Sequence, residues 1–133
     1  MTEPILGASA CIWRGGKVLL IKRGKPPGKG LWSLPGGKIE LGEAAEAAAA
    51  RELFEETQVT AKLIEAIGPF EVRRDEVIIY SITCFAGRYV SGEAVAGSDA
   101  ADVAWVYPQA LGGFELAPNI AQAIAESAKV LKL

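Results

Sequence analysis

The segment from Gly36 to Val59 constrains the fold most, because it combines a strong helix signal with an unusual concentration of negative charge. It reads GGKIELGEAAEAAAARELFEETQV. Alanine, leucine and glutamate have high helix propensities, so we expect a helix over residues 44–57. Residues three and four positions apart share one helix face. Glu52, Glu55 and Glu56 should therefore form a single acidic patch.

Such a patch needs a counter-charge, because like charges on one helix face raise the energy of the folded state. A divalent cation would supply it. The chain contains no histidine, which leaves carboxylate and carbonyl oxygens as the available ligands and favours Mg²⁺ or Mn²⁺ over zinc. Magnesium also binds phosphate oxygens, so this helix is interpreted as a diphosphate-binding surface. The alternative is an ordinary solvated acidic face, which is common on helices.

The residues around the glutamates favour the metal site. The segment is introduced by Leu34-Pro35-Gly36-Gly37, and its spacing is Gly37-x5-Glu43-x7-Arg51-Glu52-Leu53-x-Glu55-Glu56-x-Gln58-Val59. This pattern resembles the signature box of the Nudix hydrolases. The departure is Gln58, where that family has glycine. A residue with a Cβ would cost about 1 kcal/mol in the left-handed conformation that ends such a helix, so the helix end is the uncertain part of the match.

The resemblance implies an α/β/α sandwich with a mixed β-sheet between helices, and 133 residues suit one domain over residues 1–133. Gly15-Gly16 is typical of a two-residue hairpin turn, so the apolar runs 6–14 and 17–23 should pair antiparallel. Residues 24–30, rich in Pro and Gly, predict an exposed loop. Further strands are expected at 31–34, 61–67, 77–86 and 104–107, with a turn at Ser91-Gly92 and a closing helix at 118–131.

The resemblance also implies the site residues. Glu52 and Glu56 are similar to the principal metal ligands of the family and Glu55 to a further one. The backbone carbonyl near Gly36 and Gly37 would add an oxygen donor and contact the substrate.

Two more residues of the box would support these ligands. Arg51 precedes Glu55 by four residues and could hold its carboxylate by a charge-assisted bond. Glu43 lies at the start of the helix, where a negative charge also complements the helix dipole. Arg51 is therefore grouped with the catalytic residues and Glu43 with the supporting ones.

The general base stays open between Glu52 and Asp99. Asp99 lies in the loop before the Trp105 strand, where some relatives carry an additional acidic residue; a loop aspartate that caps a turn is the alternative. Arg23 is expected to contact phosphate, because it ends a strand that should point toward the box. Trp32 and Phe70 could stack on a base, although large aromatic residues more often belong to the core.

The reaction implied is metal-dependent hydrolysis of the diphosphate bond in a nucleoside diphosphate linked to another group. ADP-ribose or a nucleotide sugar is the first expectation. Some ADP-ribose-cleaving relatives carry a proline further past the signature box than Pro69. This chain has no proline between Pro69 and Pro108, which weakens the expectation of ADP-ribose. The alternatives are hydrolysis of a (deoxy)nucleoside triphosphate, in oxidised or unmodified form, and a non-catalytic nucleotide sensor on the same fold.

Composition limits the partners. Fourteen basic and sixteen acidic residues give a net charge of -2 without a basic stripe, so duplex nucleic acid is not expected. No apolar run approaches membrane-spanning length and the first residues do not resemble a signal peptide, so we expect a cytoplasmic protein. Cys11 and Cys84 lie in apolar runs and should be buried, reduced thiols. A small nucleotide is the expected partner. A second copy of the chain, in a homodimer, is also expected, because dimers are common among similar proteins.

Overall fold

A mixed sheet forms the centre of the protein in the computed structural model, which describes residues 3–133. The order β3-β2-β1-β6-β5 makes its main path, while β4 pairs with β1 and β7 pairs with β2. The bounds are β1 Ile5–Arg14, β2 Lys17–Arg23, β3 Trp32–Ser33, β4 Gly36–Lys38, β5 Thr60–Arg74, β6 Val77–Ser91 and β7 Ala100–Val106. Only β1 and β6 pair in parallel, which makes the sheet mixed within the described residues.

The first hairpin follows the sequence prediction. β1 and β2 pair antiparallel, with Arg14 opposite Lys17. Gly15 and Gly16 connect them at φ +55° and +79°, a conformation that glycine adopts without a steric penalty.

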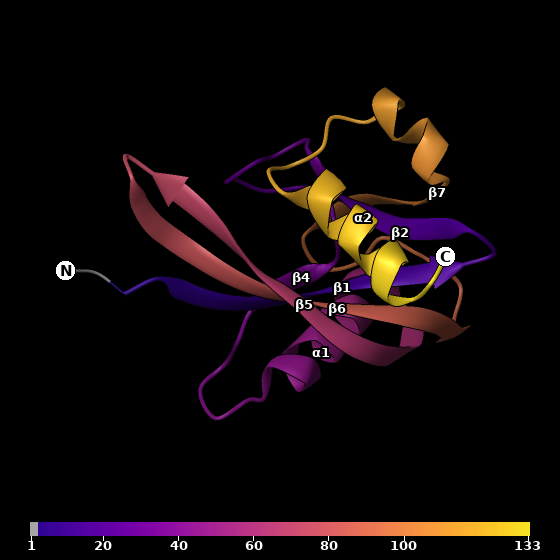
Figure 1. Ribbon diagram of the computed structural model, residues 1–133, viewed down its shortest axis with the longest axis horizontal. Coiled ribbons are helices and arrows are strands. Elements are labelled where there is room, and N and C mark those ends of the chain that lie inside the picture. Colours follow the sequence, from indigo (N-terminus) through magenta and orange to yellow (C-terminus); the bar gives the residue numbers. More distant parts are fainter. Residues whose placement is uncertain (1–2) are drawn as a thin grey trace.

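Two helices cover the two faces of the sheet, α1 (Ala45–Thr57) and α2 (Ile120–Val130), as Figure 1 shows. Leu53 of α1 packs in one buried cluster with Ile12 and Leu19. Ile124 of α2 packs in another with Val18 and other side chains of the opposite face. Strand side chains alternate between faces, so one set of strands supports both clusters. The expected α/β/α sandwich is confirmed.

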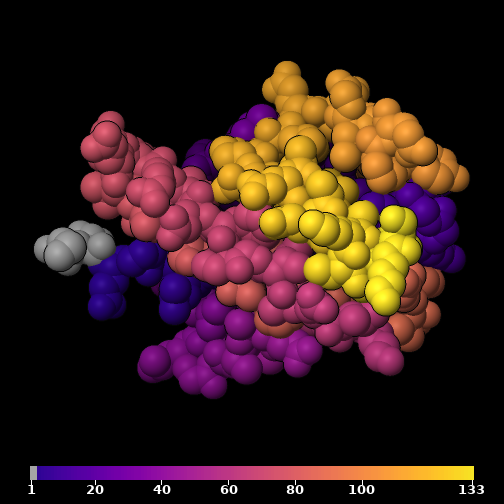
Figure 2. Space-filling model, in the orientation of Figure 1, coloured from indigo at the N-terminus to yellow at the C-terminus, as the bar shows by residue number. Residues whose placement is uncertain are grey.

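The second hairpin is longer than expected. The sequence predicts strands at 61–67 and 77–86, whereas β5 and β6 each have 15 residues and form a ribbon that projects beyond the body of the domain (Figure 2). Asp75 and Glu76 connect them with φ +51° and +66°. This is a hairpin turn without glycine, so composition provides no signal for it.

Other boundaries also differ from prediction. Gly36–Lys38 was expected to follow a strand and instead forms β4 itself, while β7 begins at Ala100 rather than 104. A 3-10 helix at Pro108–Gly113 was not expected. Ser91 still belongs to β6, and Gly92, with φ +102°, begins the connection to β7 in place of the predicted turn.

The end of α1 resolves the departure at Gln58. Gln58 adopts the left-handed conformation with φ +61°, and its N–H donates to the Phe54 carbonyl at 2.8 Å. The chain therefore keeps the glycine-type helix end with a side chain there.

The cysteines and aromatic residues take structural positions. Cys11 and Cys84 are buried free thiols, as expected, and burial raises the pKa of Cys84 to about 11. Phe70 belongs to a buried cluster, and Trp32 packs edge-on against Phe114 with ring centroids 5.1 Å apart. No helix within residues 3–133 combines the length and the apolar character that crossing a membrane requires.

Candidate active site

A cleft of about 950 Å³ opens between the end of α1, the loop after β2 and the projecting hairpin. At one end it is lined by Glu52, Glu56 and the backbone of Gly36 and Gly37. An apolar wall also lines it and consists of Phe70, Val72, Ile79, Ile82, Ile120 and Ala123, with Arg73, Arg74, Tyr80 and Asn119 beside them. A cavity of this size with a few polar groups at one end is typical of a small-ligand site.

Glu56 is the buried carboxylate of this cleft, with 7% of its surface exposed. The Gly36 N–H donates to its Oε1 at 3.0 Å. Burial raises the pKa of Glu56 to about 8, and the neighbouring Glu52 adds to the rise, whereas the Gly36 bond opposes it. A buried charge without a cation is costly, so this position favours either a proton or a positively charged ligand.

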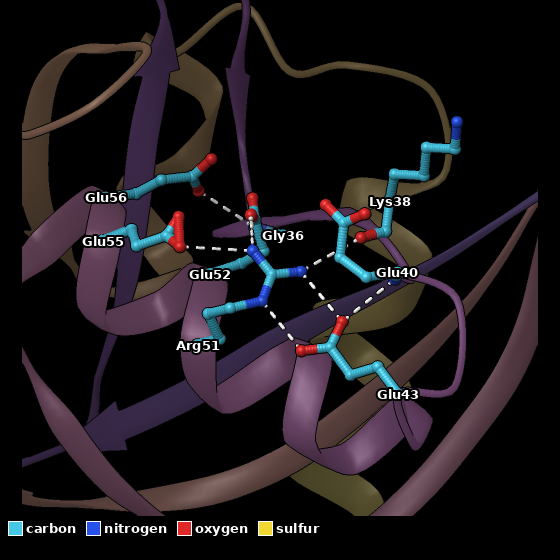
Figure 3. Close-up of polar contacts among 8 residues, drawn as sticks. All are labelled: Gly36, Lys38, Glu40, Glu43, Arg51, Glu52, Glu55 and Glu56. Atoms are coloured by element: carbon cyan, nitrogen blue, oxygen red, sulfur yellow. Dashed lines mark hydrogen bonds and ion pairs between the residues drawn. The ribbon is translucent and has the colours of Figure 1, made fainter.

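Arg51 organises the other glutamates, as Figure 3 shows. Its guanidinium donates to Glu43 at 2.8 and 3.0 Å, to Glu52 at 2.7 Å and to Glu55 at 3.2 Å. It also donates to the Lys38 carbonyl at 3.2 Å. These bonds raise the pKa of Arg51, and they lower that of Glu43 to about 2. The expected contact with Glu55 is present, and Arg51 holds Glu43 and Glu52 as well.

Two glycines of β4 allow close packing, Gly36 against β1 and Gly37 against Glu52 of α1. Gly36 pairs with Ser9 of β1, and a Cβ at Gly36 would lie 2.6 Å from the Ala8 carbonyl oxygen. A Cβ at Gly37 would overlap the Glu52 carboxylate. A side chain at Gly36 would therefore collide with β1, and a side chain at Gly37 would collide with Glu52 in its present position.

The chemistry of the donor set fits a hard divalent cation. Glu52, Glu56 and the nearby carbonyls provide oxygen ligands only, and burial leaves negative charge at Glu56 poorly compensated. Across residues 3–133, however, no three acidic or cysteine side chains already converge on one point. Arg51 draws Glu52 and Glu55 toward itself, while Glu56 is bonded to Gly36. The assignment of Glu52, Glu55, Glu56 and the Gly37 carbonyl as ligands stays a prediction.

The structure brings some predicted residues to the cleft and leaves others outside it. Arg23 and Asp99 line it. Arg51 and Glu55 do not line it, and Arg51 connects Glu55 to Glu52 by donating to both. Arg23 donates through Nε to the Pro27 carbonyl at 2.7 Å, and its charge lowers the pKa of Glu56 against the effect of burial.

Sequence reasoning missed the partner of Asp99. Lys25 lies 3.0 Å from its carboxylate, and both side chains are well exposed at the mouth of the cleft. The Asp99 carbonyl also accepts from the Gly24 N–H at 2.9 Å. The two loops meet only in the folded sheet, so no local spacing signals this ion pair.

The apolar wall was missed for a similar reason. Val72 comes from the part of β5 that was not expected to be strand, whereas Ile79 and Ile82 lie inside the strand predicted at 77–86. The alternation of Phe70 and Val72 with polar neighbours in FEVRR is a weak strand signal that the missing turn signal obscured.

Comparison of the sequence with known proteins identifies a family and several relatives. Residues 3–130 match the model of the NUDIX domain. The chain is 40% identical over 106 residues to a putative 8-oxo-dGTP diphosphatase of Bacillus subtilis, which covers 77% of this chain and 65% of the relative. It is 37% identical over 100 residues to an ADP-ribose pyrophosphatase of Methanocaldococcus jannaschii, covering 74% of this chain and 59% of the relative. The chain thus spans less than two thirds of these relatives' lengths.

A solved structure supports the fold independently. A NUDIX hydrolase from Nitrosomonas europaea superposes with a TM-score of 0.83 at 21% identity, covering 99% of this chain and 74% of that one.

Proposed function

The chain belongs to the Nudix hydrolase family, and on that premise we propose that it hydrolyses the diphosphate bond of a small nucleotide with the help of a divalent cation. One observation carries the proposal: Glu52 and Glu56 line a cleft that also has an apolar wall. A diphosphate would lie at the acidic end, neutralised by the cation, and the base or sugar would occupy the apolar end.

Mg²⁺ or Mn²⁺, when bound, supplies the charge that polarises phosphoryl oxygens and stabilises the leaving phosphate. Glu52, Glu56 and the Gly37 carbonyl would hold it, with Glu55 as a further ligand. Arg51 would orient Glu52 and Glu55, since it donates to both. Arg23 at the cleft mouth would contact a phosphate.

Asp99 is proposed as the group that accepts a proton from the attacking water, with Glu52 as the alternative. Asp99 lines the cleft but is paired with Lys25, so it would have to release Lys25 before it acts. Such an exposed pair is worth at most about 1 kcal/mol, so its opening is an easy step. We expect Asp99→Asn to lower kcat and to remove the acidic limb of its pH profile, with cation binding retained. An unchanged profile would assign proton transfer to Glu52 instead.

ADP-ribose or a nucleotide sugar is the first proposed substrate, because the apolar end offers room for a second group beyond the diphosphate. An oxidised deoxynucleoside triphosphate is the second, because the 40% identical relative is named as a putative 8-oxo-dGTP diphosphatase. The two leave different products: two monophosphates from ADP-ribose, and a nucleoside monophosphate with pyrophosphate from the triphosphate.

A substrate panel with product analysis tests the proposal. ADP-ribose, a nucleotide sugar, 8-oxo-dGTP and dGTP are each incubated with the protein and Mg²⁺, and products are separated by anion-exchange chromatography. Glu46→Gln is the matched control, because Glu46 is an exposed carboxylate of the same helix that does not line the cleft. Turnover of one substrate by the wild type and this control supports the enzyme. Saturable binding of a nucleotide without turnover of any would replace it with the nucleotide sensor.

A further inference from the structure

A second cluster of cations and aromatic rings lies at the far end of the sheet from the cleft. It consists of Arg14 and Lys17 at the β1–β2 turn and of Tyr89, Trp105 and Tyr107 on neighbouring strands or just beyond them. Arg14, Gly15, Lys17, Trp105 and Tyr107 line a hollow of about 320 Å³ there. Ser9 of β1 lines the cleft and Arg14 ends the same strand, so about 17 Å of strand separate the two sites.

Alternation places these side chains on the face that α1 covers elsewhere. Ile12 and Leu19 belong to the cluster that contains Leu53 of α1, and Arg14 and Lys17 are each two residues away along their strands. Tyr89 and Trp105 pack against the edge of that cluster. The apolar core of this face therefore ends in a layer of rings and cations at the domain surface.

Arg14 is held in position without using its hydrogen-bond donors. Its guanidinium carbon lies 3.9 Å from the centroid of the Tyr89 ring and 5.9 Å from that of Trp105. The Tyr89 ring is itself fixed, because its hydroxyl donates to the Gly92 carbonyl at 2.7 Å and its edge meets Trp105 at 5.8 Å between centroids. A guanidinium stacked in this way keeps its edge free for a planar or tetrahedral anion.

Among the described residues, the other arginines have hydrogen-bond acceptors, with the exception of Arg74. Arg51 donates to four protein groups, and Arg23, Arg73 and Arg88 each have an acceptor. Arg14 has neither a hydrogen-bond acceptor nor an ion-pair partner within residues 3–133. Lys17 likewise has no carboxylate partner in the described part, and its ammonium lies 4.9 Å from the centroid of Tyr107.

We propose that this hollow is a second anion site that binds the phosphate of a nucleotide. Arg14 would donate two hydrogen bonds to the phosphate and Lys17 would add a second positive charge. The exposed N–H of Gly15 in the turn would donate to the phosphate as well. The rings of Trp105 and the half-exposed Tyr107 line the hollow, and the attached base would stack on one of them. No acidic residue lines the hollow to oppose the anion. The nucleotide is either a free mononucleotide or one unit of a single strand, which share this chemistry.

Nuclear magnetic resonance titration of the ¹⁵N-labelled full chain tests the proposal. The buffer contains a chelator instead of Mg²⁺, so that the cleft does not turn over its ligand. Inorganic phosphate, AMP and a six-residue single-stranded oligonucleotide are added in separate series. We expect the amide signals of Gly15 and Gly16 and the indole signal of Trp105 to shift saturably with AMP, and to shift less with phosphate. Tighter binding of the oligonucleotide than of AMP would identify a strand as the source, and equal or weaker binding a free nucleotide.

Variants decide whether the two cations carry the binding. Arg14→Gln and Lys17→Gln should each weaken AMP binding by about tenfold, since each removes a charge-assisted contact. Lys129→Gln is the control, because it removes one positive charge from α2 on the opposite face. Shifts that do not saturate, that persist in both variants, or that weaken equally in Lys129→Gln would overturn the proposal. Equal affinity for phosphate and AMP would overturn the stacking of a base. The amide dispersion of each variant reports whether it is folded.

Discussion

The two helices on either side of the sheet bury side chains that differ greatly in the free-energy cost of removing them from water. α2 buries Ala123, Ile124 and Ser127, a small apolar set with one hydroxyl that accepts from the Trp13 indole at 2.8 Å. α1 buries Glu56 beside Leu53 and ends in a left-handed glutamine. A helix needed only for packing would avoid a buried carboxylate, so the cost at α1 marks the side of the sheet that binds a ligand.

The largest expected difference between the helices is that a change on α1 abolishes turnover while the protein stays folded. Glu56→Gln keeps an oxygen acceptor for the Gly36 N–H but removes the charge. We expect kcat with Mg²⁺ to fall by at least about a hundredfold, while the variant unfolds in urea no earlier than the wild type. Full activity in Glu56→Gln would remove this carboxylate from the reaction.

The opposite pattern is expected for α2. Ile124 is 3% exposed in the cluster with Val18 and Cys11, so Ile124→Ala should lower the free energy of unfolding by about 2–5 kcal/mol. Turnover per folded molecule should stay near the wild-type value under conditions where the variant is folded. Urea unfolding and activity are measured on the same samples. A fall in kcat as large as that of Glu56→Gln would erase the distinction between the two helices.

The pH dependence of stability sharpens the comparison. The pKa of Glu56 rises from 4.5 to about 8 on folding, so both states are protonated below pH 4.5 and only the unfolded state ionises as pH rises above it. The stability of the wild type relative to Glu56→Gln should therefore fall between pH 4.5 and about 8, by on the order of a few kcal/mol. Urea unfolding in metal-free buffer measures it. A difference that is flat or rises over this window would contradict the burial of an uncompensated charge.

The smallest expected effect concerns the end of α1. Gln58→Gly should stabilise the protein by up to about 1 kcal/mol, because glycine adopts φ near +61° without strain. The lower conformational entropy of glutamine in the unfolded chain favours the wild type and therefore reduces this gain. Thermal unfolding measures it, and a destabilised Gln58→Gly would show that the glutamine side chain compensates for its own backbone.

The sequence predicted best where local chemistry determines the structure. The Gly15-Gly16 hairpin, the helix over most of residues 44–57 and the covered mixed sheet followed from turn residues, helix propensity and a spaced motif. The turn at Asp75 and Glu76 was missed because it contains no glycine, and the pairing of two long strands enforces its positive φ angles.

Contacts between distant segments of the site could be anticipated only in part. Spacing indicated that Arg51 reaches Glu55, because they are one helical turn apart. The bond from Gly36 to Glu56 and the pair between Lys25 and Asp99 join segments that meet only in the folded chain. They depend on the packing of α1 and two loops around the sheet, which no local pattern encodes.

The central claim is that Glu52 and Glu56 together hold a divalent cation, and Mn²⁺ titration followed by electron paramagnetic resonance tests it most directly, because the signal counts free ion. In the presence of a non-hydrolysable nucleotide diphosphate, the wild type and Glu46→Gln should bind Mn²⁺ saturably and alike. Glu52→Gln and Glu56→Gln should bind it at least about tenfold more weakly. Equal binding by all four proteins, or no saturable binding by the wild type, would contradict the claim.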